Sequence, residues 1–154
     1  MEDKLQVILR DAIQEDLPLV YNSWLKQYRN SPFTTGMGND LYFTQHRKVI
    51  SAILKRSEVR VACDPNDSNT IYGWACGESY DTPLIHFLYV KKDFRGSGLG
   101  KMLLSEYGWE SGKHIISTHY LKYRGKEFSV GDKQIIYNPY LINIYLAKEK
   151  ENET

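Results

Sequence analysis

Residues 84–104 constrain the fold of this chain more than any other stretch. The run Leu84–Val90 is rich in β-branched and aromatic side chains and predicts a strand, and an apolar helical pattern begins near Leu99. Between them, glycines occupy alternate positions, 96, 98 and 100. Free N–H groups at a helix start attract anions, and glycine has no Cβ to keep a phosphate away from them. The stretch therefore predicts a strand, an anion-binding loop and a helix.

The spacing of these glycines excludes two common phosphate loops. A dinucleotide-binding fingerprint has the form G-x-G-x-x-G with an acidic residue about 20 positions later, whereas the glycines here run G-x-G-x-G. A P-loop requires G-x-x-x-x-G-K followed by Ser or Thr, but Met102 follows Lys101. Two alternatives stay open, a phosphate loop of another class and a glycine-rich turn that only joins a strand to a helix.

Periodicity along the whole chain predicts the element order β-α-α-β-β-β-α-β. The expected strands are residues 5–10, 58–63, 70–79, 84–90 and 115–119, and the expected helices are residues 17–30, 41–56 and 98–108. Asp16 is expected to cap the first helix. The apolar stripe of that helix is Leu17, Val20, Tyr21, Trp24, Leu25 and Tyr28, and that of the second is Phe43, Val49, Ile50, Ile53 and Leu54. Residues 134–146 predict one or two closing strands, interrupted at Asn138-Pro139.

Composition sets the broad class. A chain of 154 residues, 42% hydrophobic, predicts one globular domain over residues 1–147, with residues 148–154 fraying. A net charge of +1 gives no overall attraction to nucleic acid, and no apolar run approaches the 18 or so residues of a membrane span. With no signal peptide, we expect a cytoplasmic protein in which Cys63 and Cys76 are buried free thiols on neighbouring strands. The histidines and cysteines lack the spacing of a structural metal site, so no metal is expected.

The loop Arg95-Gly96-Ser97-Gly98-Leu99-Gly100 resembles the acyl-CoA signature of the GNAT acetyltransferases, R/Q-x-x-G-x-G/A, and the predicted element order is the GNAT order through residue 119. The resemblance implies a single α/β (α+β) domain with a mixed, mostly antiparallel sheet flanked by helices. It implies acetyl-CoA as cosubstrate and transfer of its acyl group to an amine. The residues to which it assigns cofactor binding are Arg95, Gly96, Ser97, Gly98, Leu99, Gly100 and Lys101 for the pyrophosphate, and the backbone of Leu88, Tyr89 and Val90 for the pantetheine and thioester, where the family separates its fourth and fifth strands.

The residues that would move protons are less clearly marked. The family usually continues with a helix of the form N-x-x-A-x-x-x-Y, whose tyrosine can protonate the thiolate, but residues 120–133 hold two glycines and no helical stripe. Tyr123, Tyr137 and Tyr140 are therefore equal candidates for the acid. For the base we consider His86, expected on the strand face of Leu88, and also His119 and Glu78. A histidine in a sheet can equally be a structural residue.

The acceptor is not identified by the sequence. In the GNAT fold the loop between the first two helices lines the acceptor side, which makes Phe33, Met37 and Tyr42 candidate contacts, although ordinary packing explains them as well. Residues 113–133 carry five Lys or Arg interleaved with aromatic residues, which suits a nucleic-acid surface and allows an amino group on a base as acceptor. The basic face of the second helix (Arg47, Lys48, Lys55 and Arg56) suits an anionic partner or a solvated surface. A further alternative is a non-catalytic CoA-binding module, and either a monomer or a homodimer is compatible with the sequence.

Overall fold

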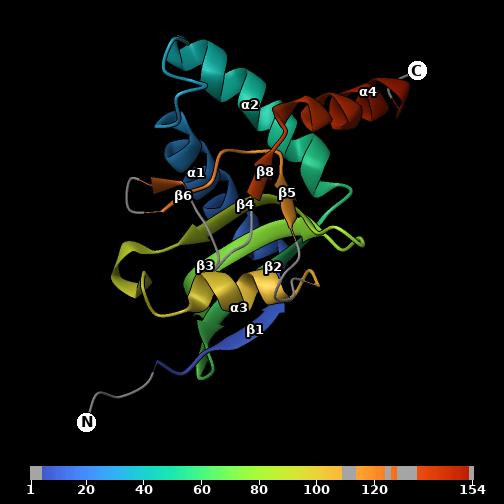
Figure 1. Ribbon diagram of the computed structural model, residues 1–154. Coiled ribbons are helices and arrows are strands. Elements are labelled where there is room, and N and C mark those ends of the chain that lie inside the picture. Colours follow the sequence, from blue (N-terminus) through green and yellow to red (C-terminus); the bar gives the residue numbers. More distant parts are fainter. Residues whose placement is uncertain (1–4, 109–113, 124–125, 128–134, 153–154) are drawn as a thin grey trace.

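The computed structural model describes residues 5–108, 114–123, 126–127 and 135–152 (Figure 1). A six-stranded sheet has the order β1-β2-β3-β4-β5-β8, and a small ribbon pairs β6 with β7. The strands from β1 to β4 are antiparallel to one another, whereas β5 runs parallel to both β4 and β8. The strands are β1 (Ile8–Asp11), β2 (Glu58–Asp64), β3 (Asp67–Glu78), β4 (Leu84–Val90), β5 (Ile115–Ser117), β6 (Lys122–Tyr123), β7 (Lys126–Glu127) and β8 (Ile135–Tyr137).

Helices cover both faces of this sheet. Figure 1 shows α3 lying across one face, while α1 and α2 lie on the other side and α4 runs beside α2. The α-helices are α1 (Leu17–Arg29), α2 (Asn39–Leu54), α3 (Leu99–Ser105) and α4 (Ile142–Asn152), and short 3₁₀ helices are η1 (Gln14–Asp16), η2 (Lys92–Phe94) and η3 (Pro139–Leu141). The predicted order through the fifth strand is confirmed, and Cys63 and Cys76 are buried free thiols as expected. No helix within these described ranges has the length and apolar character needed to cross a membrane.

The core beneath α1 is built around Trp24, which is fully buried. Its ring centroid lies 5.6 Å from that of Trp74 on β3 and 5.3 Å from that of Phe87 on β4. Trp74 Nε1 donates a hydrogen bond to Ser23 Oγ at 2.8 Å, so this indole is buried without losing its polar partner. Burying one large apolar side chain stabilises the fold by roughly 1.5–3 kcal/mol, so these rings fix α1 firmly on the two central strands.

Asp16 holds the first strand to the first helix instead of capping that helix. Its carboxylate accepts from Arg10 Nη1 at 2.7 Å and Nη2 at 3.0 Å, and from the backbone N–H of Ile13 at 2.8 Å. The Arg10 hydrogen bond holds the pKa of Asp16 below its usual value. The expected cap on α1 is wrong because the carboxylate turns back toward β1, and no side chain caps that helix.

Two other expectations fail for reasons of packing. Phe43 was expected inside but is 41% exposed, while its neighbour Tyr42 is buried and donates to the carbonyl oxygen of Leu25 at 2.7 Å. Of the one or two closing strands expected, β8 forms and ends at Tyr137, just before the expected interruption. Asn138 accepts a hydrogen bond from the backbone N–H of Tyr140 at 3.2 Å and starts a helical segment, which continues as α4 through residue 152 and includes residues 148–152 of the tail expected to fray. Residues 153–154 lie outside the described ranges.

The contact between β3 and β4 depends on two glycines and contains a bulge. A Cβ atom at Gly73 would lie 2.6 Å from the carbonyl oxygen of Tyr89, and one at Gly77 would lie 2.7 Å from that of Leu84. In this register Phe87 pairs with Cys76 and Ile85 pairs with Gly77. His86 is therefore an extra residue on β4 without a partner on β3, which is a β-bulge.

We expect Gly73→Ala to lower the free energy of unfolding by about 1–3 kcal/mol, since the new methyl group meets a backbone oxygen that cannot move without shifting β4. Gly36→Ala is the matched control, because nothing lies within 4 Å of a Cβ at that position. Urea unfolding of both variants measures the difference. Equal stability of the two variants would contradict the close approach of β3 and β4.

Candidate active site

Strands β4 and β5 separate after a short stretch of pairing. Leu84 pairs with Ile116 and Ile85 pairs with Ser117, and the backbone N–H of Thr118 donates to the carbonyl oxygen of Ile85 at 3.3 Å. Beyond Ile85, the rest of β4 has no partner on β5 in the part of the chain that the structure describes. Apart from the Val90 carbonyl oxygen, which accepts from Arg95 Nε, the backbone groups on this edge are therefore available to a ligand.

The glycine loop follows directly from this unpaired part of β4. After Val90 the chain forms η2, then passes Gly96 and Gly98, whose φ angles of 84° and 87° are in the left-handed region that favours glycine, and enters α3. Arg95 Nε donates to the carbonyl oxygen of Val90 at 2.9 Å, which ties the loop to the end of β4. Leu99 is buried, whereas residues 95–98 are exposed. The predicted loop is thus anchored at both ends and open to solvent between them.

A buried chain of hydrogen bonds begins at Glu78, where β3 ends. Glu78 Oε2 lies 2.7 Å from His86 Nε2, and His86 Nδ1 lies 2.9 Å from Thr118 Oγ1. Thr118 Oγ1 is 3.0 Å from His119 Nδ1, and His119 Nε2 is 2.8 Å from His46 Nε2 on α2. His86, Thr118 and His119 are all fully buried. The chain joins three sequence candidates, Glu78, His86 and His119, to two residues that sequence reasoning missed.

The carboxylate of Glu78 sets the direction of these hydrogen bonds. It accepts from the hydroxyl groups of Tyr80, at 2.8 Å, and Tyr145, as well as from His86. An ionised carboxylate only accepts, so His86 carries its proton on Nε2. When His86 Nδ1 acts as the acceptor, Thr118 donates to it and accepts from His119 Nδ1. His119 Nε2 then accepts from His46, so that every donor in the chain points toward Glu78.

Burial and hydrogen bonding determine the charges along this chain. Burial lowers the pKa of His46 to about 4 and, with the nearby histidines, lowers the pKa of His119 well below its usual value, so both are neutral near pH 7. Burial by itself raises the pKa of Glu78, but hydrogen bonds from His86, Tyr145 and Tyr80 outweigh it and leave the pKa below its usual value. Burial raises the pKa of Tyr145, which therefore keeps its proton. Glu78 is therefore the negatively charged group of this hydrogen-bonded chain.

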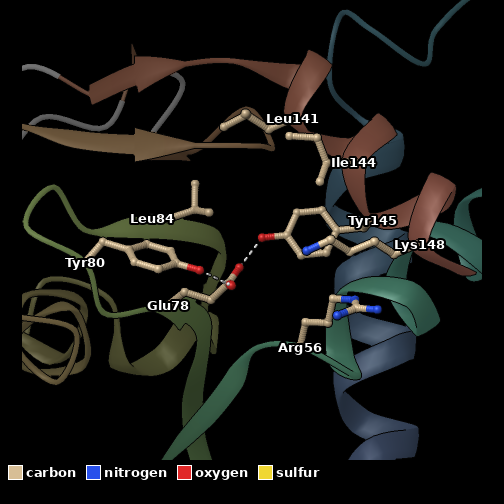
Figure 2. A pocket seen from close by; sticks show the side chains of 8 residues that line it. All are labelled: Arg56, Glu78, Tyr80, Leu84, Leu141, Ile144, Tyr145 and Lys148. Carbon is tan, nitrogen blue, oxygen red and sulfur yellow. Dashed lines mark hydrogen bonds between the residues drawn. The ribbon is translucent and has the colours of Figure 1, made fainter.

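A pocket of about 390 Å³ opens over Glu78 (Figure 2). In Figure 2 the hydroxyl groups of Tyr80 and Tyr145 point at the Glu78 carboxylate from two sides, and Arg56 and Lys148 lie on the side of the pocket near α2 and α4. The pocket is lined by Arg56, Glu78, Tyr80, Leu84, Leu141, Ile144, Tyr145 and Lys148. It therefore combines one carboxylate, two cationic side chains and an apolar wall.

Aromatic side chains surround the other end of the chain, at His46 and His119. The Tyr28 ring centroid lies 4.8 Å from that of His46 and 4.6 Å from that of His119. Tyr137 reaches this cluster through its hydroxyl, 3.2 Å from that of Tyr28, and Phe33 packs against Tyr137 at 4.8 Å between ring centroids. Tyr137 is therefore at the far end from Glu78.

Several sequence candidates lie away from Glu78. Tyr140 is 79% exposed and Met37 is exposed too, while the Tyr42 hydroxyl already donates to a backbone carbonyl group. The side chains of Tyr123 and of the five Lys and Arg residues of segment 113–133 lie outside the described residues. The strand-face argument for His86 is wrong, because His86 is the bulge residue. Its ring packs against Tyr145 of α4, 5.0 Å between centroids.

Tyr145 is the residue of this site that a sequence signal could have found. Asn138 and Tyr145 are separated as in the family's N-x-x-A-x-x-x-Y helix, with Leu141 in the place of the alanine. This segment follows β8, whereas the motif was sought directly after β5. Thr118 and His46 carry no sequence signal of their own, since each becomes part of the site only through contacts made across the fold.

These features together define an acetyltransferase-like α/β domain: the mixed sheet, the separation of β4 from β5, and the glycine loop before α3. A sequence model of the acetyltransferase (GNAT) family matches residues 17–115, and the chain belongs to this family. A search of curated protein sequences gives no significant match.

Solved structures support the fold. A candidate acetyl transferase from Pyrococcus furiosus aligns over 93% of this chain and 91% of its own, with 18% identity and a TM-score of 0.53. The structure described as histone acetyltransferase HPA2 and related acetyltransferase from Corynebacterium glutamicum aligns over 65% of this chain and 68% of its own, with 17% identity and a TM-score of 0.50. At these identities the likeness concerns the fold alone.

Because His46 is neutral in the folded protein, we expect the protein to lose stability in mild acid. His46 has a pKa of about 4 in the folded protein and near 6.5 when unfolded, so between these values the unfolded chain binds a proton that the folded chain does not. The free energy of unfolding should therefore fall as the pH drops from about 6.5 to 4, and His46→Gln should make this fall shallower. The exposed His114, changed to Gln, is the control. Urea unfolding across this pH range measures the slopes, and equal slopes for wild type and His46→Gln would contradict the prediction.

Proposed function

We propose that this protein is an acyl-CoA-dependent N-acyltransferase that transfers an acetyl group from acetyl-CoA to an amine. Membership of the GNAT family carries the proposal, and the Arg95–Gly100 loop beside the unpaired end of β4 supports it. Acetyl-CoA would supply an activated thioester. Two tasks then belong to the protein: holding the cosubstrate, and moving one proton from the amine and one to the thiolate.

Cosubstrate binding is proposed for the loop and for β4. The backbone N–H groups of residues 96–101, at the exposed loop and the start of α3, suit a pyrophosphate, because Gly96 and Gly98 have no side chains in its way, and Lys101 adds positive charge. Leu88, Tyr89 and Val90 pair with β3 on one edge only, and the other edge of this stretch suits the pantetheine amides and the thioester carbonyl group, although the Val90 carbonyl oxygen already accepts from Arg95 Nε. Donors fixed in place before the reaction typically lower a barrier of this kind by a few kcal/mol.

Proton transfer is proposed for the pair of groups that share a hydrogen bond, Glu78 and Tyr145. As the neutral amine forms its C–N bond and the C–S bond breaks, Glu78 accepts the proton that leaves the nitrogen and Tyr145 gives its proton to the sulfur. The direct hydrogen bond from Tyr145 to Glu78 then returns the proton to the tyrosine. His86 is a positioning residue that orients the Glu78 carboxylate. His119 and Tyr137, the other sequence candidates, lie farther along the chain of contacts from Glu78.

We expect Gly98→Glu to abolish saturable binding of acetyl-CoA and of free CoA, since the new carboxylate would repel the pyrophosphate. Gly108→Glu is the matched control, because Gly108 has a similar φ of +82°, equally open surroundings and a place beyond the end of α3. Titration calorimetry on both variants and on the wild type measures binding. If the wild type binds neither ligand, the acyltransferase proposal fails.

We expect Glu78→Gln to lower kcat by about 10²–10⁴-fold, which is the usual contribution of a positioned general base, while CoA binding is retained. Glu58→Gln, at an exposed position at the start of β2, is the control. Release of free thiol from acetyl-CoA with an amine acceptor measures the rate. A Glu78→Gln variant as active as the wild type would assign the base elsewhere, and CoA binding without turnover of any amine would favour a non-catalytic module.

A further inference from the structure

We propose that the pocket over Glu78 binds the amine acceptor and that this acceptor is a small primary amine carrying an anionic group. The inference rests on the acyltransferase function proposed above and adds the chemical class of its acceptor. Three properties of the pocket lead to it: the Glu78 carboxylate at its floor, two cationic side chains on one side, and an apolar wall formed by Leu84, Leu141 and Ile144.

The floor of the pocket suits an amine. Glu78 is ionised and receives hydrogen bonds from His86 and Tyr145, both buried, and from Tyr80, which is 61% exposed. An incoming amine would replace the Tyr80 hydroxyl, the one of these three donors that is free to turn into solvent. The amine nitrogen would then lie against the Glu78 carboxylate and beside Tyr145.

The rim of the pocket suits an anion. Arg56, just after α2, and Lys148, on α4, both line the pocket and are exposed, and within the described residues neither has a hydrogen-bond or ion-pair partner. Their sequence neighbours, Lys55 and Glu149, differ because they pair with each other. Lys55 Nζ lies 2.6 Å from Glu149 Oε2, so the two charges neutralise each other. Two unpaired cations therefore face a pocket that holds one carboxylate, and a guanidinium group binds carboxylate or phosphate through two parallel hydrogen bonds.

The size and the wall of the pocket limit the linker between the two charged groups. Leu84, Leu141 and Ile144 are apolar and complete the lining. A volume of about 390 Å³ is near the lower end of the roughly 300–1,000 Å³ range of small-molecule pockets, so the ligand is a small molecule with a short apolar linker.

The position of the pocket fits an acceptor approaching from the side opposite the acyl donor. Leu84 lines the pocket at the first residue of β4, whereas the glycine loop follows Val90 at the last. At about 3.3 Å per residue these ends are roughly 20 Å apart. The His86 bulge lies toward the pocket end of β4, where β4 and β5 begin to separate. The Glu78 carboxylate, which accepts a hydrogen bond from His86, lies at this end too.

The test compares matched amines with and without an anionic group. Titration calorimetry with the CoA-saturated full-length protein would use 5-aminopentanoate against pentylamine, and phosphoethanolamine against ethanolamine. We expect the anionic member of at least one pair to bind about tenfold tighter or more, and Arg56→Gln and Lys148→Gln each to remove about tenfold of that affinity. The control variants Arg47→Gln on α2 and Lys150→Gln on α4 change residues outside the pocket lining and should bind the anionic amine as tightly as the wild type does.

The outcomes separate this inference from the function on which it rests. Preference for the carboxylate or for the phosphate supports the inference and identifies the anion. Equal affinity within both pairs, no amine binding, or a preference unaffected by Arg56→Gln and Lys148→Gln overturns it, even when the protein binds CoA and acetylates neutral amines. Failure of CoA itself to bind would instead overturn the proposed function.

Discussion

The structure depends on the unequal way in which β4 is held by its two neighbours. Strand β3 pairs with both ends of β4 around the bulge at His86, helped by Gly73 and Gly77, while within the described residues β5 pairs with it only at Leu84 and Ile85. A buried strand normally satisfies its backbone groups on both edges, so the unpaired part of β4 is a place where a ligand's amides or carbonyl group can complete the sheet. The same separation lets the residues after β5, Thr118 and His119, turn toward the α1 side.

The buried chain of hydrogen bonds from Glu78 to His46 is the second constraint on the structure. Burying polar groups is costly unless each one is hydrogen-bonded, and here each link lies between 2.7 and 3.0 Å. Burial keeps His46 and His119 neutral, so the negative charge stays on Glu78, at the end that meets the pocket. The chain therefore holds His86 in one orientation and directs its Nε2 proton to the carboxylate.

Local sequence signals predicted the elements formed by neighbouring residues. Strand β4 has the predicted bounds, and the glycine loop leads into a helix as its spacing indicates. The failures occur where one specific side-chain hydrogen bond overrides the local pattern. Asp16 bonds to Arg10 instead of capping α1, Tyr42 is buried in place of Phe43, and Asn138 starts a helix where apolar residues suggested a strand.

By itself, the sequence determined the strand, glycine loop and helix of residues 84–104 and the family to which they belong, because these depend on local periodicity and on glycine spacing. It also named Glu78, His86 and His119 as candidates, but it did not join them. Only the tertiary structure decided that a bulge turns His86 toward α4, and that Tyr145 meets Glu78 from 67 residues away. The physical reason is that a hydrogen bond between distant residues depends on strand register and helix packing, which the whole chain settles together.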